Sequence, residues 1–210
     1  MMNQWKLLLL AGVLARTATF ACPARAQDDF AADAARLVTV LKLEPGQTVA
    51  DIGAGRGQLT VALAREVGPS GRIYATELEA DRLRDIRGAV ESADLHNVTV
   101  LEAHATRTNL PEECCDALVL RRVYHHFSDP GRMNPSLRQS LKPGGLLAVI
   151  DFAPDGSESA EPADRDTGDQ HGVTSETVVR ELGQAGFEPV LVEQGDRPDR
   201  YLVVVRRPAE

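Results

Sequence analysis

The sequence predicts a three-layer α/β/α domain around a seven-stranded, mostly parallel sheet whose last strand is antiparallel. Three observations carry this prediction. Apolar strand-like segments alternate with helical patterns along most of the chain, which is typical of a parallel sheet with helices on both faces. A glycine-rich turn follows the first strand. Two strand-like segments then stand close together near the end, as in a hairpin that adds antiparallel pairing at one edge.

The helices follow from apolar positions at helical spacing. Over residues 29–42 these positions predict a first helix, which Glu44-Pro45-Gly46 ends. A second helix ends at the turn over residues 68–71, which contains two glycines and a proline. The predicted helices after the first are 59–67, 80–93, 135–141 and 175–185.

The strands are short apolar segments bounded by turn residues. They are predicted over 48–52, 72–78, 98–103, 117–123, 146–152, 187–193 and 201–206. The Lys-Pro-Gly-Gly turn at 142–145 leads into the fifth of them. Between this strand and the last helix, residues 154–172 are rich in Asp, Glu, Gly, Ser and Pro, and loops of that length usually form lids or are disordered.

The first 26 residues differ from the rest of the chain. Lys6 precedes a short apolar run at 7–15, and small residues then lead to Ala24-Arg25-Ala26. This layout is that of a secretory signal cleaved after Ala26, and the run is too short to span a bilayer. We therefore expect a signal peptide over 1–26, a mature domain over 27–210 exported to the periplasm, and no stable membrane insertion after cleavage. An uncleaved anchor or a misassigned start is the alternative; if the signal is not used, the protein is cytoplasmic.

The charge of the chain excludes one class of partner. The formal net charge is −8, and loss of residues 1–26, which hold three basic residues and no acid, would make it −11. Nucleic-acid binding needs clustered Lys and Arg to neutralise phosphates. We therefore expect no nucleic-acid partner, and the sequence leaves the oligomeric state open.

The glycine-rich turn at 49–57 has the sequence VADIGAGRG. Gly53, Gly55 and Gly57 alternate after Asp51 and before a helix. Glycines let a backbone turn sharply and approach a ligand, and free N–H groups at a helix start favour an anionic or polar group. The spacing G-x-G-x-G differs from the dinucleotide motif G-x-G-x-x-G. The alternative is a tight structural turn without a ligand.

A second acid strengthens the ligand interpretation. Glu77 ends the next predicted strand, 20 residues after Gly57. A carboxylate at that place accepts both hydroxyl protons of a ribose that lies across the strand ends. Taken alone, Glu77 is equally explained as a solvated acid at a strand end.

The ordered motifs resemble the class I S-adenosylmethionine-dependent methyltransferases, in particular the methyltransferase type 11 group that includes the ubiquinone- and menaquinone-pathway C-methyltransferases. The resemblance covers about residues 30–207. It rests on the glycine motif at 51–57, the acid at Glu77, the fourth strand with its His-His exit at 115–127, and the turn at 141–146. Segment 171–187 also resembles the family's region before its last strand pair. The resemblance implies a Rossmann-like fold and S-adenosylmethionine as cofactor.

The resemblance also implies roles for individual residues. The acid and glycines of the motif would hold the methionine end of the cofactor, the ribose acid its hydroxyls, and the apolar residue after that acid the adenine: Asp51, Gly53, Gly55, Gly57, Glu77 and Leu78. His104, next to Ala105, stands where the family commonly has an Asp that accepts a hydrogen bond from the adenine amino group. Neutral imidazole accepts one such bond in the right tautomer. Arg121 is a candidate contact for the cofactor's carboxylate, with a structurally paired arginine as the alternative.

Methyl transfer from a sulfonium depends mainly on positioning, and a base is needed only where the acceptor must lose a proton. Tyr124, His125 and His171 are the candidates to contact the acceptor, because 124–126 follow the fourth strand at the edge where ligands bind in such folds. The alternative is that His125 and His126 begin a helix and pack structurally. No metal site is predicted, because no further Cys or His completes a ligand set at familiar spacing.

The sequence therefore predicts an enzyme that transfers a methyl group from S-adenosylmethionine to a small-molecule acceptor. One alternative is a binding module that holds the cofactor without turnover. A second is an NAD-dependent reductase, which the glycine spacing and the absence of a Tyr-x-x-x-Lys pair disfavour.

Overall fold

The computed structural model describes residues 30–166, 171–195 and 199–209. The predicted export signal over residues 1–26 lies outside these residues. Among the helices of the described part, none combines the length and the apolar character that a membrane span requires.

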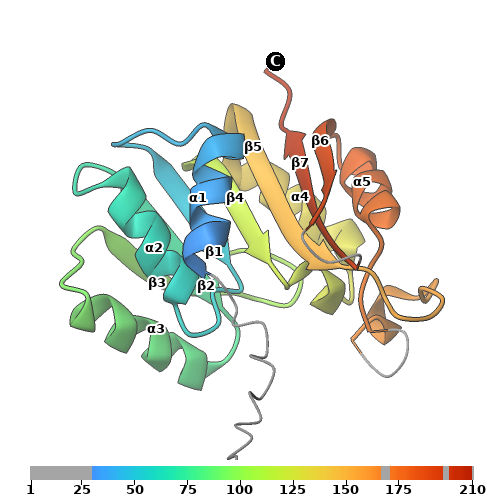
Figure 1. Cartoon of the computed structure of the whole chain (residues 1–210), viewed down its shortest axis with the longest axis horizontal. Coiled ribbons are helices and arrows are strands. Elements are labelled where there is room, and N and C mark those ends of the chain that lie inside the picture. Colours follow the sequence, from blue (N-terminus) through green and yellow to red (C-terminus); the bar gives the residue numbers. More distant parts are fainter. Residues whose placement is uncertain (1–29, 167–170, 196–198, 210) are drawn as a thin grey trace, which may run out of the picture.

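Seven strands form one sheet in the order β3-β2-β1-β4-β5-β7-β6 (Figure 1). The strands are β1 (Thr48–Ile52), β2 (Arg72–Glu77), β3 (Val98–Glu102), β4 (Cys115–Arg121), β5 (Leu141–Phe152), β6 (Glu188–Gln194) and β7 (Arg200–Arg206). Strands β1 to β5 pair in parallel, whereas β7 lies antiparallel between β5 and β6. The predicted Rossmann-like α/β/α sheet with an antiparallel last strand is confirmed.

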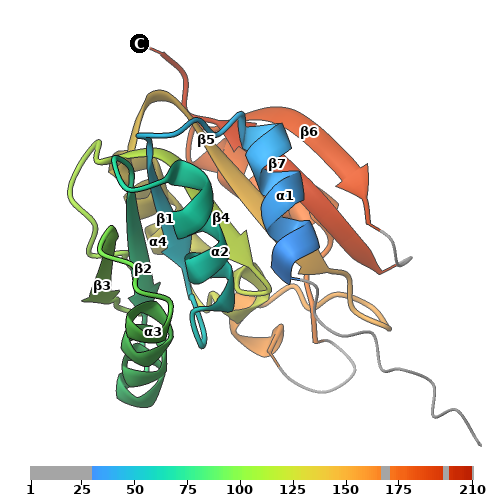
Figure 2. The same cartoon turned by 60° about the vertical axis from the view of Figure 1, so that its left-hand side comes forward.

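Helices cover both faces of this sheet. The helices are α1 (Phe30–Leu41), α2 (Gln58–Val67), α3 (Ala80–Ser92), α4 (Pro130–Ser140) and α5 (Ser175–Gln184), with short 3₁₀ turns η1 (Tyr124–His126) and η2 (Pro162–Asp164). Figures 1 and 2 show α1, α2 and α3 on one face and α4 and α5 on the other.

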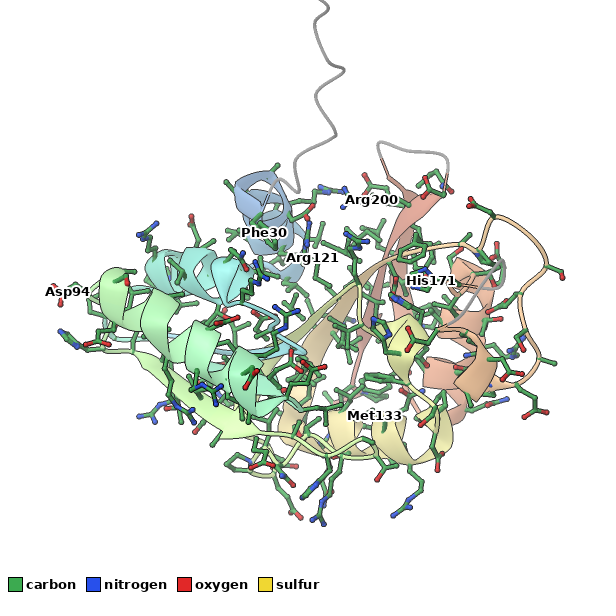
Figure 3. All side chains as sticks on the ribbon, turned by 90° about the horizontal axis from the view of Figure 1, so that it is seen from below. Phe30, Asp94, Arg121, Met133, His171 and Arg200 are labelled. Atoms are coloured by element: carbon green, nitrogen blue, oxygen red, sulfur yellow. The ribbon has the colours of Figure 1, made fainter. Side chains whose placement is uncertain are left out.

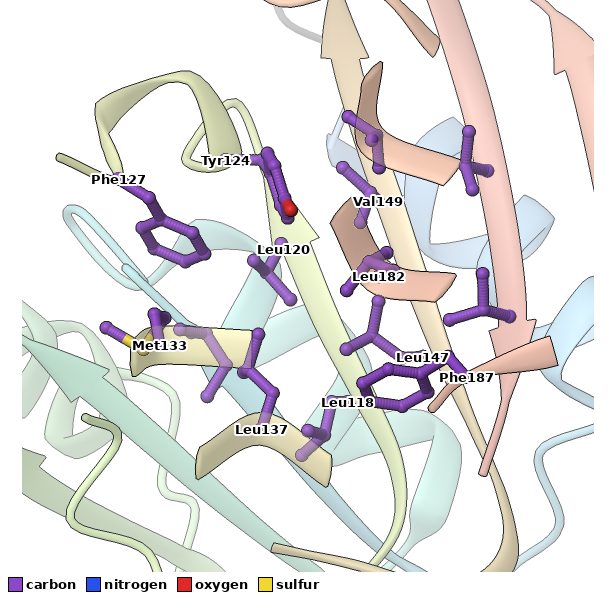
Figure 4. Packing of buried hydrophobic residues seen from close by; sticks show 14 of the residues in the cluster. Leu118, Leu120, Tyr124, Phe127, Met133, Leu137, Leu147, Val149, Leu182 and Phe187 are labelled. Carbon is purple, nitrogen blue, oxygen red and sulfur yellow. The ribbon is translucent and has the colours of Figure 1, made fainter. Parts of the chain in front are cut away.

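The two faces bury two apolar clusters, because successive side chains of a strand point to opposite sides. In β4, Leu118 and Leu120 face α4 and α5, whereas Ala117 and Val119 face α1 and α2. Figure 4 shows the first cluster, with Tyr124 above Leu120 and beside the helices α4 and α5. Tyr124 and Phe127, in and just after the 3₁₀ turn that follows β4, are therefore part of the core.

Two predicted boundaries were wrong. Helix α4 begins at Pro130 rather than at residue 135, because the Asp129 carboxylate caps it by accepting the Arg132 N–H at 3.1 Å. An N-cap acid followed by proline at the first helical position is a start signal, which the glycine after it masked. Strand β5 begins at Leu141 rather than at 146, since Gly144 N–H donates to the Arg207 carbonyl at 2.9 Å and thereby extends the sheet.

The described part of the 154–172 loop packs on the domain. Arg165 is 2% exposed, and its guanidinium binds the Glu181 carboxylate of α5 at 2.7 Å. Glu158 accepts hydrogen bonds from the hydroxyls of Thr174 and Thr177 at 2.7 and 2.9 Å. These contacts fix the first described part of the loop, residues 154–166, to the start and the middle of α5.

Candidate functional site

A cavity of about 500 Å³ opens at the carboxyl ends of β1, β2 and β4. In the strand order, β1 and β4 are neighbours where the chain reverses direction across the sheet, which is where open α/β sheets bind ligands. Its volume lies in the range of small-molecule sites. The residues that line it include Gly53, Gly55, Thr76, Glu77, Leu78, Arg82, His104, Ala105, Arg122, Val123, His126, Phe127, Met133 and Asp166.

The floor of the cavity is the glycine turn after β1. Gly53 has φ +66°, and a Cβ added there would stand 2.6 Å from a methyl group of Val123. Gly55 has φ +57° with no atom within 4 Å of an added Cβ, so its missing side chain leaves open space on the cavity side. The first glycine is thus required by packing and the second keeps the cavity accessible.

The Glu77 carboxylate connects this turn to β2. One of its oxygens accepts the Gly55 N–H at 2.9 Å, and the other accepts the Leu78 N–H at 2.7 Å. A carboxylate has about four acceptor positions, so each oxygen keeps one position for a hydroxyl donor in the cavity. Glu77 is therefore oriented by the backbone before any ligand arrives.

Further predicted positions lie on the same cavity wall. His104, Ala105 and the exposed Leu78 all line it. Thr76 is fully buried at the end of β2, and its hydroxyl has no hydrogen-bond partner within the described part of the chain. These groups combine an apolar surface for a flat base with polar atoms that are available to a ligand.

Asp51 and Gly57 occupy different positions, and neither is among the described residues that line the cavity. The Asp51 carboxylate accepts the Thr60 hydroxyl of α2 at 2.6 Å. Gly57 lies against α3, where an added Cβ would be 3.2 Å from the Ile86 Cα. Both residues hold α2 and α3 behind the glycine turn.

The burial of Asp51 has an electrostatic consequence. The side chain is 1% exposed, and desolvation raises its pKa to about 6, against the lowering effects of the Thr60 hydroxyl and the Arg121 guanidinium. The carboxyl group therefore becomes charged over the pH range just below neutrality.

Arg121 faces α1 rather than the cavity. Its guanidinium binds the Asp33 carboxylate at 2.5 Å and stacks over the Phe30 ring at 4.2 Å from the ring centre. Figure 3 shows the two labelled residues, Phe30 and Arg121, side by side. This is the structurally paired arginine that the sequence left as the alternative, while the next residue, Arg122, lines the cavity.

The three residues predicted to contact the acceptor are not among the described residues that line the cavity. Tyr124 is fully buried; its hydroxyl accepts from the Asn134 amide at 2.7 Å and donates to the Glu181 carboxylate at 3.1 Å. Burial, with the Glu181 charge beside it, raises the pKa of this hydroxyl above its ordinary value. His125 and His171 contact each other with ring centres 4.8 Å apart.

On the β4 side, the histidine that lines the cavity is His126, which the sequence interpretation did not select. Its Nδ1 lies 2.6 Å from the Asp166 carboxylate, and both side chains line the cavity. Burial, followed by the His125 charge, lowers the pKa of His126. Phe127 and Met133 complete the apolar wall beside it. The position of His125 and His126 just after β4 was the signal that the sequence offered. Only the 3₁₀ turn decides which of these two histidines faces the cavity.

These residues fit the cofactor that the resemblance implies. The turn at Gly53 and Gly55 exposes backbone at the floor, Glu77 offers two oriented oxygens, and the unpartnered Thr76 hydroxyl is a further polar group. S-adenosylmethionine carries a ribose, an adenine and a charged amino-acid end, which match a carboxylate, an apolar wall and a polar floor.

Comparison with known proteins agrees with this fit. The family model described as a methyltransferase domain matches residues 50–149. The demethylmenaquinone methyltransferase of Listeria welshimeri is 28% identical over 112 residues, which are 53% of this chain and 48% of the relative. The ubiquinone/menaquinone biosynthesis C-methyltransferase UbiE of Vibrio vulnificus is 30% identical over 110 residues, which are 52% of this chain and 42% of the relative. The chain thus spans about half the length of the curated relatives it matches.

Similarity in structure extends over more of the chain. A crystal structure of an S-adenosylmethionine-dependent methyltransferase from Aquifex aeolicus superposes with a TM-score of 0.71 and 25% identity, covering 83% of this chain and 89% of the other. Because the fold, the glycine turn, the strand-end acid and these relatives agree, residues 50–149 form a methyltransferase domain of the class I S-adenosylmethionine-dependent type, and its cofactor is S-adenosylmethionine.

Proposed function

We propose that this protein transfers the methyl group of S-adenosylmethionine to a small-molecule acceptor. The observation that carries the proposal is the cavity of about 500 Å³ in which the glycine turn, Glu77 and His126 meet. When bound, the cofactor supplies a methyl group already activated on a sulfonium, so the protein contributes mainly position and exclusion of water.

The residues of the chain divide this task between them. Glu77 binds the ribose hydroxyls, and the turn at Gly53 and Gly55 leaves space for the rest of the cofactor. His126, Phe127 and Met133 form the wall across the cavity from Glu77, where an acceptor would approach. A neutral His126 at physiological pH, which its lowered pKa favours, has a lone pair to accept a proton from an acceptor that must lose one.

The acceptor is proposed to be a small molecule on two grounds. The cavity has the size of small-molecule sites, and the acidic chain lacks the basic character of a nucleic-acid binder. The relatives named above are named for demethylmenaquinone and for ubiquinone/menaquinone biosynthesis, which are small-molecule contexts.

The hypothesis that Tyr124, His125 or His171 contacts the acceptor stays a prediction. His125 and His171 both contact His126, with ring centres 3.9 and 6.4 Å away. They therefore also support the position of His126 at the cavity wall. Turnover in the three alanine variants tests the hypothesis: normal turnover in all three would remove these residues from the acceptor site.

The first test is calorimetric titration of the purified chain with S-adenosylmethionine. Glu77→Ala removes both acceptors for the ribose, and Gly55→Val fills the open space at the floor. We expect each variant to weaken binding by at least about tenfold. For Glu77→Ala the reason is that lost hydrogen bonds to a charged group are worth about 1.5–3 kcal/mol, and for Gly55→Val it is that the new side chain occupies space the cofactor needs. Glu102→Ala is the matched control, because Glu102 pairs with Glu77 in register on the next strand and is exposed.

Binding in the low micromolar range that Glu102→Ala preserves would support the site, and methyl transfer from labelled cofactor to a panel of small molecules would then find the acceptor. A folded wild-type protein that does not bind the cofactor would contradict the proposed function. Binding without transfer to any acceptor would instead favour the non-catalytic module.

We also propose that residues 1–26 form an export signal that is removed after Ala26. The support is the sequence pattern alone: a basic start, a short apolar run and an Ala-Arg-Ala end. Mass spectrometry of the protein recovered from cell fractions tests this. An N-terminus at Gln27 in the periplasmic fraction is expected, and an intact Met1 in the cytoplasm would contradict it.

A further inference from the structure

Beside the cofactor cavity, the fold brings together two imidazoles and a carboxylate from separate segments. His125 follows β4, while Asp166 and His171 belong to the loop between β5 and α5. One ligand atom from each lies within 4.8 Å of the others. We propose that His125, Asp166 and His171 bind one divalent transition-metal ion, with Zn²⁺ as the ion that this donor set suits best.

His125 is oriented as a metal-binding histidine. Its Nδ1 lies 2.8 Å from the Asp151 carboxylate, and the two side chains are 2% and 0% exposed. The backbone N–H groups of His125 and Phe152 also donate to Asp151, at 3.3 and 3.0 Å. Because the carboxylate accepts the Nδ1–H, the lone pair of the neutral ring is on Nε2. A carboxylate behind a histidine is the usual outer partner of a metal ligand.

His171 is held against His125 by its own segment. The two rings meet edge to face at 74°, and Phe152 packs against His171 at 80° with ring centres 5.0 Å apart. The next residue, Gly172, donates its N–H to the Arg165 carbonyl at 2.9 Å, and Val173 donates to the Phe152 carbonyl at 3.0 Å. Figure 3 shows the labelled His171 beside helix α5 in the view from below.

Asp166 is positioned from the opposite arm of the loop. Its neighbour Arg165 is anchored by Glu181 at 2.7 Å, so the loop enters the cluster from a fixed point. The Asp166 carboxylate lies 2.6 Å from His126 Nδ1 and its side chain is 53% exposed. One oxygen is thus oriented by His126, and the carboxylate keeps enough freedom to turn toward the two imidazoles.

The donor set decides which ligand is expected. Two histidines and one carboxylate are the protein ligands of catalytic zinc sites, which leave a fourth position open. Ligand atoms around tetrahedral zinc are about 3.4 Å apart, given metal–ligand distances of about 2.0–2.2 Å. Rotations of the half-exposed Asp166 and of His171 would close the present separation to this value. A metal on Nε2 of His125 would also offset the charge of the fully buried Asp151.

The alternative is that the rings of His125, His126, His171 and Phe152 only pack together. The matched comparison is a second His–Asp pair in the same chain: His96 lies 3.4 Å from Asp94, with both side chains about nine-tenths exposed. This pair has the same two groups but no third ligand beside it among the described residues. The His96–Asp94 pair therefore serves as a control for the weak affinity that any exposed histidine has for zinc.

The test is equilibrium dialysis of the untagged, chelator-treated chain against Zn²⁺, without S-adenosylmethionine, and a parallel titration with Co²⁺ followed by visible absorption. The variants are His171→Gln and Asp166→Asn, with His96→Gln as control. Circular dichroism confirms that each is folded. Because cofactor binding is measured separately, a failure of this proposal leaves the proposed function standing.

We expect one Zn²⁺ per chain, a Co²⁺ spectrum of low coordination number, and binding weakened at least about tenfold in both loop variants but unchanged in His96→Gln. Binding of less than one ion per chain at micromolar zinc would overturn the site. Equal affinity in the wild type and both loop variants would overturn it as well, because the bound ion would then lie elsewhere.

Discussion

The two sides of the cavity are built in different ways. On the β1–β2 side, backbone conformation makes the site: positive φ angles at Gly53 and Gly55, and N–H groups that orient Glu77. On the β4–β5 side, side chains make it, through His125 with Asp151 and Arg165 with Glu181. Both sides join residues from separate elements, 22 positions apart in sequence on the first side and 26 and 16 on the second, so the two sides differ in the groups that make the contacts and not in sequence separation.

Because of this difference, different substitutions should disrupt the two sides. A site built by the backbone fails when a side chain is added, and a site built by buried, hydrogen-bonded side-chain pairs fails when one partner is removed. Four substitutions test this difference, in order of decreasing predicted loss or gain of stability.

Arg165→Met tests the side-chain side. The change removes the cation between Glu158 and Glu181, whose side chains are only 17% and 12% exposed. A carboxylate left unpaired in such a place destabilises strongly, so we expect the free energy of unfolding to fall by about 3 kcal/mol. Urea denaturation measures it. The double variant Arg165→Met with Glu181→Met should recover part of the loss, and no recovery would mean that Arg165 stabilises mainly by its packing.

Gly53→Ala tests the backbone side. The new Cβ would stand 2.6 Å from Val123 at a φ of +66°, so we expect a loss of about 2–3 kcal/mol from overpacking and the left-handed backbone. Gly55→Ala is the control, since it has a similar φ but no atom within 4 Å; its expected loss is about 1 kcal/mol. Equal losses of stability in the two variants would show that Val123 moves aside and that contact with Val123 is not the reason for glycine at position 53.

Asp51→Asn tests the buried acid behind the turn. The pKa is about 6 in the folded protein against 3.8 for the ordinary side chain, so the folded state binds more protons between these values. Stability is therefore lost as the pH rises through that window. We expect Asp51→Asn to raise the free energy of unfolding by about 1–2 kcal/mol at pH 8 and by much less at pH 4.

The measurement is chemical denaturation of both proteins across this pH range. A difference that stays constant from pH 4 to pH 8 would contradict the raised pKa. Thr60→Val separates the hydrogen bond from the charge, because it removes the hydroxyl that the carboxylate accepts at 2.6 Å.

Arg36→Ala is expected to have the smallest effect. Arg36 of α1 pairs with Glu193 of β6, and both side chains are more than two-fifths exposed. Exposed ion pairs contribute about 0–1 kcal/mol, so the midpoint of thermal unfolding should shift by no more than about 4 °C. A larger loss of stability would mean that this ion pair fixes the edge strand β6 to helix α1. The contact between α1 and β6 would then stabilise the fold in addition to the two sides of the cavity.

The succession of strands and helices along the chain could be predicted from the sequence alone, because alternation of apolar segments and turn residues is a local property. The sequence also determined the glycine turn and Glu77, since a conformation that only glycine adopts readily is visible in the residue type. The start of α4 was equally local, in Asp129 followed by Pro130, but the glycine and proline around it obscured that signal.

In contrast, tertiary packing was needed to show which histidine faces the cavity and which arginine binds Asp33. His125 and His126 are adjacent in sequence, as are Arg121 and Arg122, and each pair separates because one member points into the domain and the other toward the cavity. The meeting of His125, Asp166 and His171 likewise depends on a loop anchored by Arg165 on α5. Residue type determines what a side chain can bind, but the packing of distant elements determines what it meets.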